Sequence, residues 1–141
     1  MVTSYKTLSW IIVAFVLATG ASAYWTEMRE IRDVSYELRA ETPELTIVNV
    51  ESYIYDRFSE NYWTDGSKKY QEPHQTWKSG GGDCTDFAEL AKLMLYYNGV
   101  RTERVKSTTP EGGLHDMLWS AYGYVNVLKT PISRVNGGGY W

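Results

Sequence analysis

The sequence predicts an α+β domain in which helices precede a small antiparallel sheet. Two stretches, 42–58 and 86–98, carry apolar residues at helical spacing. The chain then changes to strand-like runs at 100–106, 115–122 and 124–129. A group of helices followed by a group of strands is typical of the α+β class, in which the helices cover one side of the sheet.

The first 23 residues have the pattern of a secretory signal peptide. Lys6 supplies the positive start, Leu8 to Leu17 form a short apolar segment, and Ala21-Ser22-Ala23 is a small-residue cleavage pattern. The apolar core is about ten residues, whereas a membrane span needs about 20. We therefore predict cleavage after Ala23. The alternative is an uncleaved N-terminal anchor, because residues 19–25 could extend the apolar segment. Either places the domain outside the cytosol, as a periplasmic, secreted or membrane-anchored protein.

The rest of the chain is predicted to form one domain. Residues 24–41 are expected to be a spacer or a marginal helix, because their apolar positions alternate with many charges. The folded domain is predicted at 42–131, and the Gly-rich segment 132–141 is expected to be a tail. Cleavage at Ala23 would leave 141 − 23 = 118 residues, which suffice for a single core.

Two helix boundaries carry local signals. Thr42 is predicted to cap a helix that starts at Pro43, with Ile47, Val50, Ile54 and Phe58 as its buried face. A short helix is expected at 71–78. The central helix, 86–98, should bury Phe87, Leu90 and Met94 and end at Gly99, a residue type that readily adopts the left-handed conformation after a helix.

Cys84 is the only cysteine, and it lies between the glycine run 80–82 and the central helix. The thiolate is the reactive form of cysteine, and the partial positive charge of a helix N-terminus favours it. His115, one of two histidines, could accept the thiol proton. If the chain is exported, Cys84 has no second cysteine in the chain with which to form a disulfide. Its thiol would then form an intermolecular disulfide, be buried, or be kept as a reactive group. A buried, inert cysteine is the simplest structural interpretation.

From about Tyr53 to Thr130 the chain resembles the transglutaminase-like cysteine peptidase superfamily, particularly its small bacterial members. The segment from Gly82 to Ala88, Gly-Asp-Cys-Thr-Asp-Phe-Ala, is similar to the family's Gly-Asp-Cys-Xaa-Asp-Phe-Ala block at a helix start. Pro73-His74-Gln75-Thr76 resembles the family's lead-in, and Gly99-Val100-Arg101 its turn into the first strand. His115 falls where the family has its catalytic histidine.

The resemblance implies a papain-like core, with the cysteine at a helix N-terminus and the histidine on an antiparallel sheet. It also implies an acid or amide that orients the histidine, and here the chain departs from the family. No carboxylate follows Asp116, and the expected position falls on Leu128. Asn126 is the remaining candidate, because asparagine can fix an imidazole tautomer. A tight turn at Tyr122-Gly123 would pair Asn126 with Trp119, too far from His115. The alternative interpretation of Asn126 is a strand residue with an exposed amide.

Other polar residues near Cys84 have structural interpretations. Asp83 and Asp86 are predicted to cap the central helix, with their charges directed away from the thiol. Gln71 or Gln75 could donate a hydrogen bond to an oxyanion, although the backbone N–H of Cys84 is the safer donor. His74 could join Cys84 and His115 around a metal ion, but the spacings match no zinc pattern. We therefore expect no metal and no cofactor.

These features predict an exported thiol-dependent amide hydrolase of the cysteine peptidase type, acting through an acyl-enzyme on peptide or cell-wall peptide bonds. Transfer of the acyl group to an amine is a variant of the same chemistry. The alternatives are a catalytically degenerate transglutaminase-like binding module and a structural protein anchored by its N-terminus. The net charge of −3 would become −4 without Lys6, which disfavours nucleic acid as a partner. We expect a monomer that contacts a membrane only through an uncleaved N-terminal segment.

Overall fold

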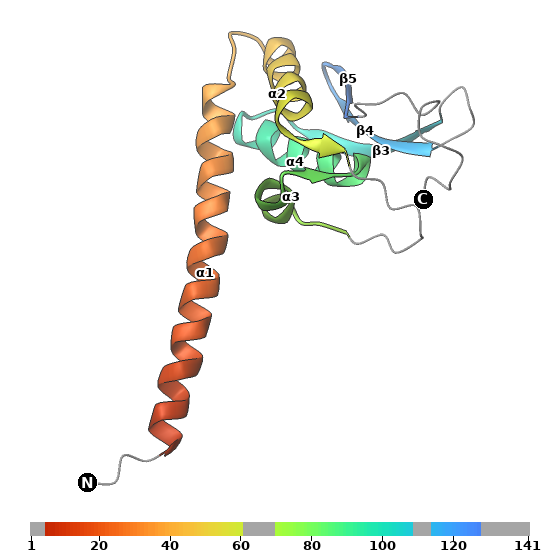
Figure 1. Cartoon of the computed structure of the whole chain (residues 1–141). Helices are drawn as coiled ribbons and strands as arrows, with labels where there is room; N and C mark the ends of the chain where they lie inside the picture. The colour runs from red at the N-terminus through yellow and green to blue at the C-terminus, as the bar shows by residue number, and fades with distance from the viewer. Residues whose placement is uncertain (1–4, 61–69, 109–113, 128–141) are drawn as a thin grey trace.

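The structure is a computed structural model that describes residues 5–60, 70–108 and 114–127. The expected turn at 61–66, the tail at 132–141 and the last residues of the third predicted strand lie outside these ranges. The described residues form an α+β arrangement, as predicted (Figure 1). The helices are α1 (Tyr5–Glu37), α2 (Pro43–Arg57), α3 (Pro73–Ser79) and α4 (Cys84–Tyr97). The strands are β1 (Ser59–Glu60), β2 (Gly81–Gly82), β3 (Thr102–Thr108), β4 (Leu114–Ser120) and β5 (Gly123–Asn126).

Helix α4 lies at the centre of the fold, between the other helices and the sheet. It contacts α1, α2 and α3 as well as β3 and β4. Its apolar residues Phe87, Leu90 and Met94 are fully buried, as the helical spacing predicted. Gly99 has a φ of 76°, which confirms its predicted place just after the helix. The fold is therefore built around the helix that Cys84 begins.

Helix α2 starts as its sequence predicts. Oγ1 of Thr42 accepts a hydrogen bond of 3.2 Å from the backbone N–H of Leu45, and Pro43 is the first helical residue. The predicted buried face is confirmed, with Ile47, Val50, Ile54 and Phe58 in the hydrophobic core. Helix α2 thereby covers α4 and also contacts β5.

Helix α1 is continuous from Tyr5 to Glu37, so most of the segment 24–41, expected to be a spacer or a marginal helix, is helical. The N-terminal part extends away from the other elements, whereas the C-terminal part lies against them (Figure 1). There Ile31 is fully buried in the common core, and partly buried Met28, Val34 and Leu38 pack against it. Trp77 Nε1 of α3 also donates a hydrogen bond of 3.0 Å to Glu30 of α1. Residues 24–38 are therefore packed as part of the domain.

The N-terminal part of α1 exposes its apolar side chains, including Trp10, Phe15 and Leu17. Ser9–Glu37 is long enough and contains a sufficiently apolar window to cross a membrane, although a signal sequence near an N-terminus meets the same criteria. The finding is compatible with both the signal peptide and the anchor.

The three-stranded sheet is antiparallel in the order β3-β4-β5. Ser120 pairs with Gly123, so the β4–β5 hairpin has a two-residue loop, Ala121-Tyr122. Asn126 consequently pairs with Met117. The pairing of Asn126 with Trp119 that a turn at Tyr122-Gly123 would give is not formed, and Asn126 lies two residues nearer to His115.

The packing of α1 can be tested with Ile31→Ala in the full-length chain. Removing a fully buried isoleucine side chain should lower the free energy of unfolding by about 2–5 kcal/mol, because the cavity left by the lost atoms cannot close completely. The measurement is urea unfolding in mild detergent. Val48→Ala, on the exposed side of α2, is the control and should change the value by less than about 0.5 kcal/mol. Equal effects of the two variants would contradict the packing.

Candidate active site

Cys84 is the first residue of α4, and its side chain is fully buried. Asp83 is the N-cap, and its Oδ1 accepts hydrogen bonds from the backbone N–H groups of Thr85 at 2.9 Å and Asp86 at 3.1 Å. The first turn is therefore capped, as predicted, by a carboxylate that occupies backbone donors next to the thiol. The sulfur lies beside the positive end of the helix dipole.

Asp86 completes a reciprocal cap. Its Oδ2 accepts from the backbone N–H of Asp83 at 3.0 Å and from Nε2 of Gln71 at 3.2 Å, while its Oδ1 accepts from the N–H of Gln71 at 3.1 Å. Burial raises the pKa of Asp86, and these hydrogen bonds oppose the rise. The structural role predicted for Asp83 and Asp86 is confirmed.

The two glutamines considered as oxyanion donors both take part in local hydrogen bonds, and for Gln71 these use the donor nitrogen itself. Nε2 of Gln71 donates to Gly81 O at 3.2 Å as well as to Asp86, and its Oε1 accepts from Ser79. Oε1 of Gln75 accepts from the backbone N–H of Glu72, within the cap of α3. Gln71 therefore links the loop before α3 to the start of α4.

Gly82 is required by the close approach of Asp86. A Cβ atom at position 82 would lie 2.7 Å from Cβ and 2.8 Å from Oδ2 of Asp86. Gly82 also pairs with Glu60 in the short parallel ladder of β1 and β2, which sets the path of the chain into α4. The glycine before the Asp-Cys pair thus makes room for a buried carboxylate.

A direct side-chain contact joins the start of α4 to β4. Oγ1 of Thr85 donates a hydrogen bond of 2.6 Å to Oδ2 of Asp116, and Asp116 is only 2% exposed. Nζ of Lys106, on β3, forms an ion pair with Oδ1 of Asp116 at 3.4 Å. Sequence reasoning did not assign a role to this contact. The available signal was the position of Asp116 immediately after His115.

His115 lies on β4 opposite Ser107 of β3 and is 8% exposed. Successive strand residues point to opposite faces, so His115 leaves the strand on the side opposite to Asp116. Its Nδ1 is buried and has no hydrogen-bond partner among the described residues, Cys84 included. Burial lowers the pKa of His115, and the charge of Asp116 partly opposes this change. Helix α4 and strand β4 are in contact, but the β4 side chain bonded to the start of α4 is Asp116, and His115 lies on the other side of the strand.

Asn126 lies on the same sheet face as His115, because its partner Met117 is two residues from His115. Such diagonal neighbours are separated by about 7–8 Å, within reach of long side chains. The backbone of Asn126 is held by α2, since its N–H donates to Glu51 at 2.7 Å and its carbonyl accepts from the Tyr55 hydroxyl at 2.6 Å. The register therefore places Asn126, an exposed residue, on the same sheet face as His115.

His74 has a different environment from Cys84 and His115. Its ring lies edge-on to Tyr24 of α1, with ring centroids 4.8 Å apart. Within 5–60, 70–108 and 114–127, no three histidine, cysteine, aspartate or glutamate side chains are grouped so that they could hold a metal ion.

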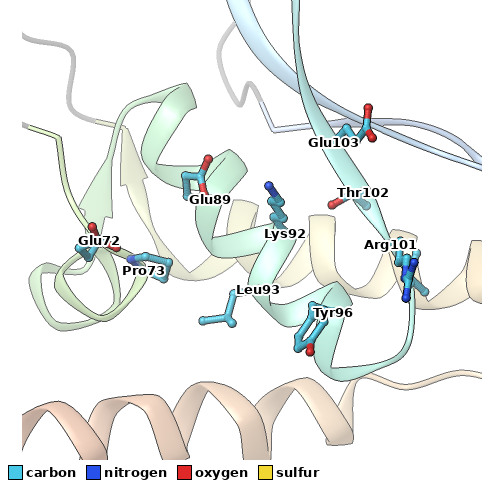
Figure 2. Close-up of a pocket in the computed structure, with 10 residues that line it drawn as sticks. Glu72, Pro73, Glu89, Lys92, Leu93, Tyr96, Arg101, Thr102 and Glu103 are labelled. Atoms are coloured by element: carbon cyan, nitrogen blue, oxygen red, sulfur yellow. The ribbon is translucent and has the colours of Figure 1, made fainter.

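A cavity of about 510 Å³ lies on another side of α4. Figure 2 shows Lys92, Leu93 and Tyr96 of α4 near Arg101 and Thr102 at the start of β3. Neither Cys84 nor His115 lines this cavity. This cavity is therefore separate from the proposed nucleophile.

Comparison with known proteins supports the fold. No protein family and no curated protein matches the chain by sequence. A crystal structure from Cytophaga hutchinsonii, described as a "Putative Cysteine Protease", matches with a TM-score of 0.56 at 13% identity. The match covers 75% of this chain and 39% of that protein. The chain thus has an α+β, cysteine protease-like fold, which agrees with the predicted papain-like class, and it spans well under half the length of its structural neighbour.

His115 should make stability depend on pH. Its pKa is lowered in the folded protein, so the unfolded chain binds more protons as pH falls through the ordinary histidine range near 6.5. This contribution to stability is complete above that range and is lost as pH falls through the lower folded pKa. Urea unfolding at several pH values between 8 and 5 should show a smaller loss for His115→Gln than for the wild type. Equal losses would contradict the pKa shift.

Proposed function

We propose that the chain is an exported cysteine peptidase or amidase of the transglutaminase-like type, with Cys84 as its nucleophile. The observation that carries this proposal is the Gly82–Ala88 block at the capped start of α4, within a cysteine protease-like fold. A thiol in this position lies beside the positive end of the helix dipole, which favours a developing negative charge. The substrates proposed are peptide or cell-wall peptide bonds.

In the proposed reaction, the Cys84 thiolate attacks an amide carbonyl, and His115 holds the thiol proton. His115 then delivers that proton to the leaving amine as the amide C–N bond breaks, which leaves a thioester on Cys84. Water attacks the thioester, releases the carboxylic acid and restores the thiol. The backbone N–H of Cys84 is the proposed donor to the oxyanion. Catalytic hydrogen bonds are often long in substrate-free structures. Because His115 leaves β4 on the side opposite to Asp116, which is bonded to α4, the proposed proton transfer requires the part of β4 that carries His115 to shift toward the sulfur when substrate binds.

Asn126 is proposed to orient His115. Its place on the same sheet face and its anchored backbone support this role. A neutral amide can fix the imidazole tautomer, but it stabilises imidazolium less than a carboxylate would.

A second candidate function is a transglutaminase-like binding module without turnover. Two observations favour it: Cys84 is fully buried, and Nδ1 of His115 has no partner among the described residues. A domain that only binds has no need of an accessible thiol or of a histidine proton acceptor.

We further propose that the N-terminal segment directs export, either as a cleaved signal peptide or as an anchor. The exposed apolar side chains of α1 support both forms. N-terminal sequencing of the protein from its native host separates them. Tyr24 as the first residue indicates cleavage, Met1 in a membrane fraction indicates an anchor, and Met1 in the soluble cytosol would contradict export.

The peptidase function predicts an activated thiol. Cys84 should react with iodoacetamide well below pH 8, because the helix N-terminus and the proton acceptor favour thiolate, whereas a free thiol has a pKa of about 8.5. His115→Ala should move the pH profile of alkylation upward. Mass spectrometry of the intact protein gives the alkylation rate at each pH, and Cys84→Ser is the blank.

A wild-type profile like that of a free thiol would reject the activated nucleophile and favour the binding module.

Asn126→Ala separates the orientation of His115 from the activation of the Cys84 thiol. It should lower peptide turnover while it changes the alkylation profile and the unfolding free energy little, because the amide transfers no proton. Unchanged turnover in Asn126→Ala would show that Asn126 is an ordinary strand residue.

A further inference from the structure

The contact between Thr85 and Asp116 has chemical features that packing alone does not require. Asp116 is 2% exposed, and a buried carboxylate is costly unless its oxygens are hydrogen-bonded or paired with a charge. The Thr85 hydroxyl supplies a bond of 2.6 Å to Oδ2. Oδ1 has no hydrogen-bond partner among the described residues, although Nζ of Lys106 is 3.4 Å away. An apolar side chain at this position would avoid these costs.

The position of the contact gives it a specific consequence. Thr85 follows Cys84, and Asp116 follows His115, so the hydrogen bond joins the residues next to the nucleophile and next to its proton acceptor. The other capping bonds of the first turn involve Asp83, Asp86 and Gln71, none of which lies on the sheet. Among the side-chain bonds described at this helix start, the Thr85–Asp116 bond is the one that fixes it to β4.

We propose, on the basis of the peptidase function above, that Asp116 is a positioning residue that acts through Thr85. It holds the first turn of α4, and therefore the Cys84 sulfur and the adjacent backbone N–H groups, in register with His115 on β4. Lys106 from β3 is the charged group that faces Asp116. The charge of Asp116 also acts on neighbouring His115, which lies on the other side of the strand, and Asp83 and Asp86 lie in the helix start that Asp116 contacts. Asp116 itself touches neither the thiol nor a substrate in this role.

The test uses the full-length protein in mild detergent and the pH midpoint of Cys84 alkylation by iodoacetamide. The midpoint reports thiolate formation, whereas a simple gain or loss of access scales the rate at every pH. Thr85→Val removes the hydroxyl but keeps a branched side chain, and it should raise the midpoint by roughly one pH unit. Thr85→Ser restores the hydroxyl and should return the midpoint to the wild-type value.

Two further variants separate positioning from stability and from charge. Thr102→Val is the matched control, since Thr102 is also a buried threonine but its Oγ1 has no hydrogen-bond partner among the described residues. Its alkylation midpoint should equal that of the wild type. Asp116→Asn keeps an oxygen acceptor for Thr85 while it removes the charge. It should lower the pKa of His115, measured by NMR, without raising the alkylation midpoint.

The outcomes distinguish the two proposals. A wild-type midpoint below pH 8 with no change in Thr85→Val overturns the positioning role and leaves the peptidase proposal standing. Equal shifts in Thr85→Val and Thr102→Val also overturn it, because the effect would then come from loss of any buried hydroxyl. A wild-type midpoint like that of a free thiol rejects the peptidase proposal, and the positioning role fails with it.

Discussion

The structure depends on how three buried aspartates are accommodated at one helix start. Asp83, Asp86 and Asp116 are 4%, 0% and 2% exposed. Ionised carboxylates can be buried only where donors or cations compensate them, and the first turn of α4 supplies free backbone N–H groups at that place. The remaining donors come from Gln71 and Thr85. Three features serve this requirement. The loop before α3 brings the N–H of Gln71 to Asp86, Gly82 leaves space for Asp86, and β4 lies close enough for Asp116 to reach Thr85.

The same arrangement sets the electrostatics of the thiol. Backbone dipoles at a helix start favour thiolate, whereas nearby carboxylates disfavour it. Two of the aspartates accept hydrogen bonds from specific backbone N–H groups. Asp83 accepts from two N–H groups of α4, and Asp86 accepts from the N–H groups of Asp83 and Gln71. The electrostatic environment of the Cys84 thiol therefore depends on the direction in which each carboxylate is hydrogen-bonded, and not only on the number of charges around the sulfur.

The sequence allowed prediction of the features that depend on neighbouring residues. The Thr42 cap, the Asp83 cap and the end of α4 at Gly99 are local, and the structure confirms them. The register of Asn126 was not predictable. Moving the two-residue loop to Ala121-Tyr122 changes every residue pair between β4 and β5, and no residue type in this hairpin specifies the position of the loop. The contact of Thr85 with Asp116 joins residues 31 apart in the chain, so the position of Asp116 beside His115 could draw attention to the aspartate but could not identify its partner. In α1, the surrounding charges obscured an apolar stripe that tertiary packing uses.

The unbroken course of α1 has a consequence for the anchored form of the protein. At about 1.5 Å per residue, its 33 residues span about 50 Å, and no hinge separates the exposed apolar part from the part packed in the core. Such a helix would act as a rigid strut rather than a tether. Each residue inserted in it would turn the domain by about 100° and lift it by about 1.5 Å relative to the bilayer. The distance of the Cys84 side of the domain from the bilayer, and the direction it faces, would then be set by the number of residues in one helix.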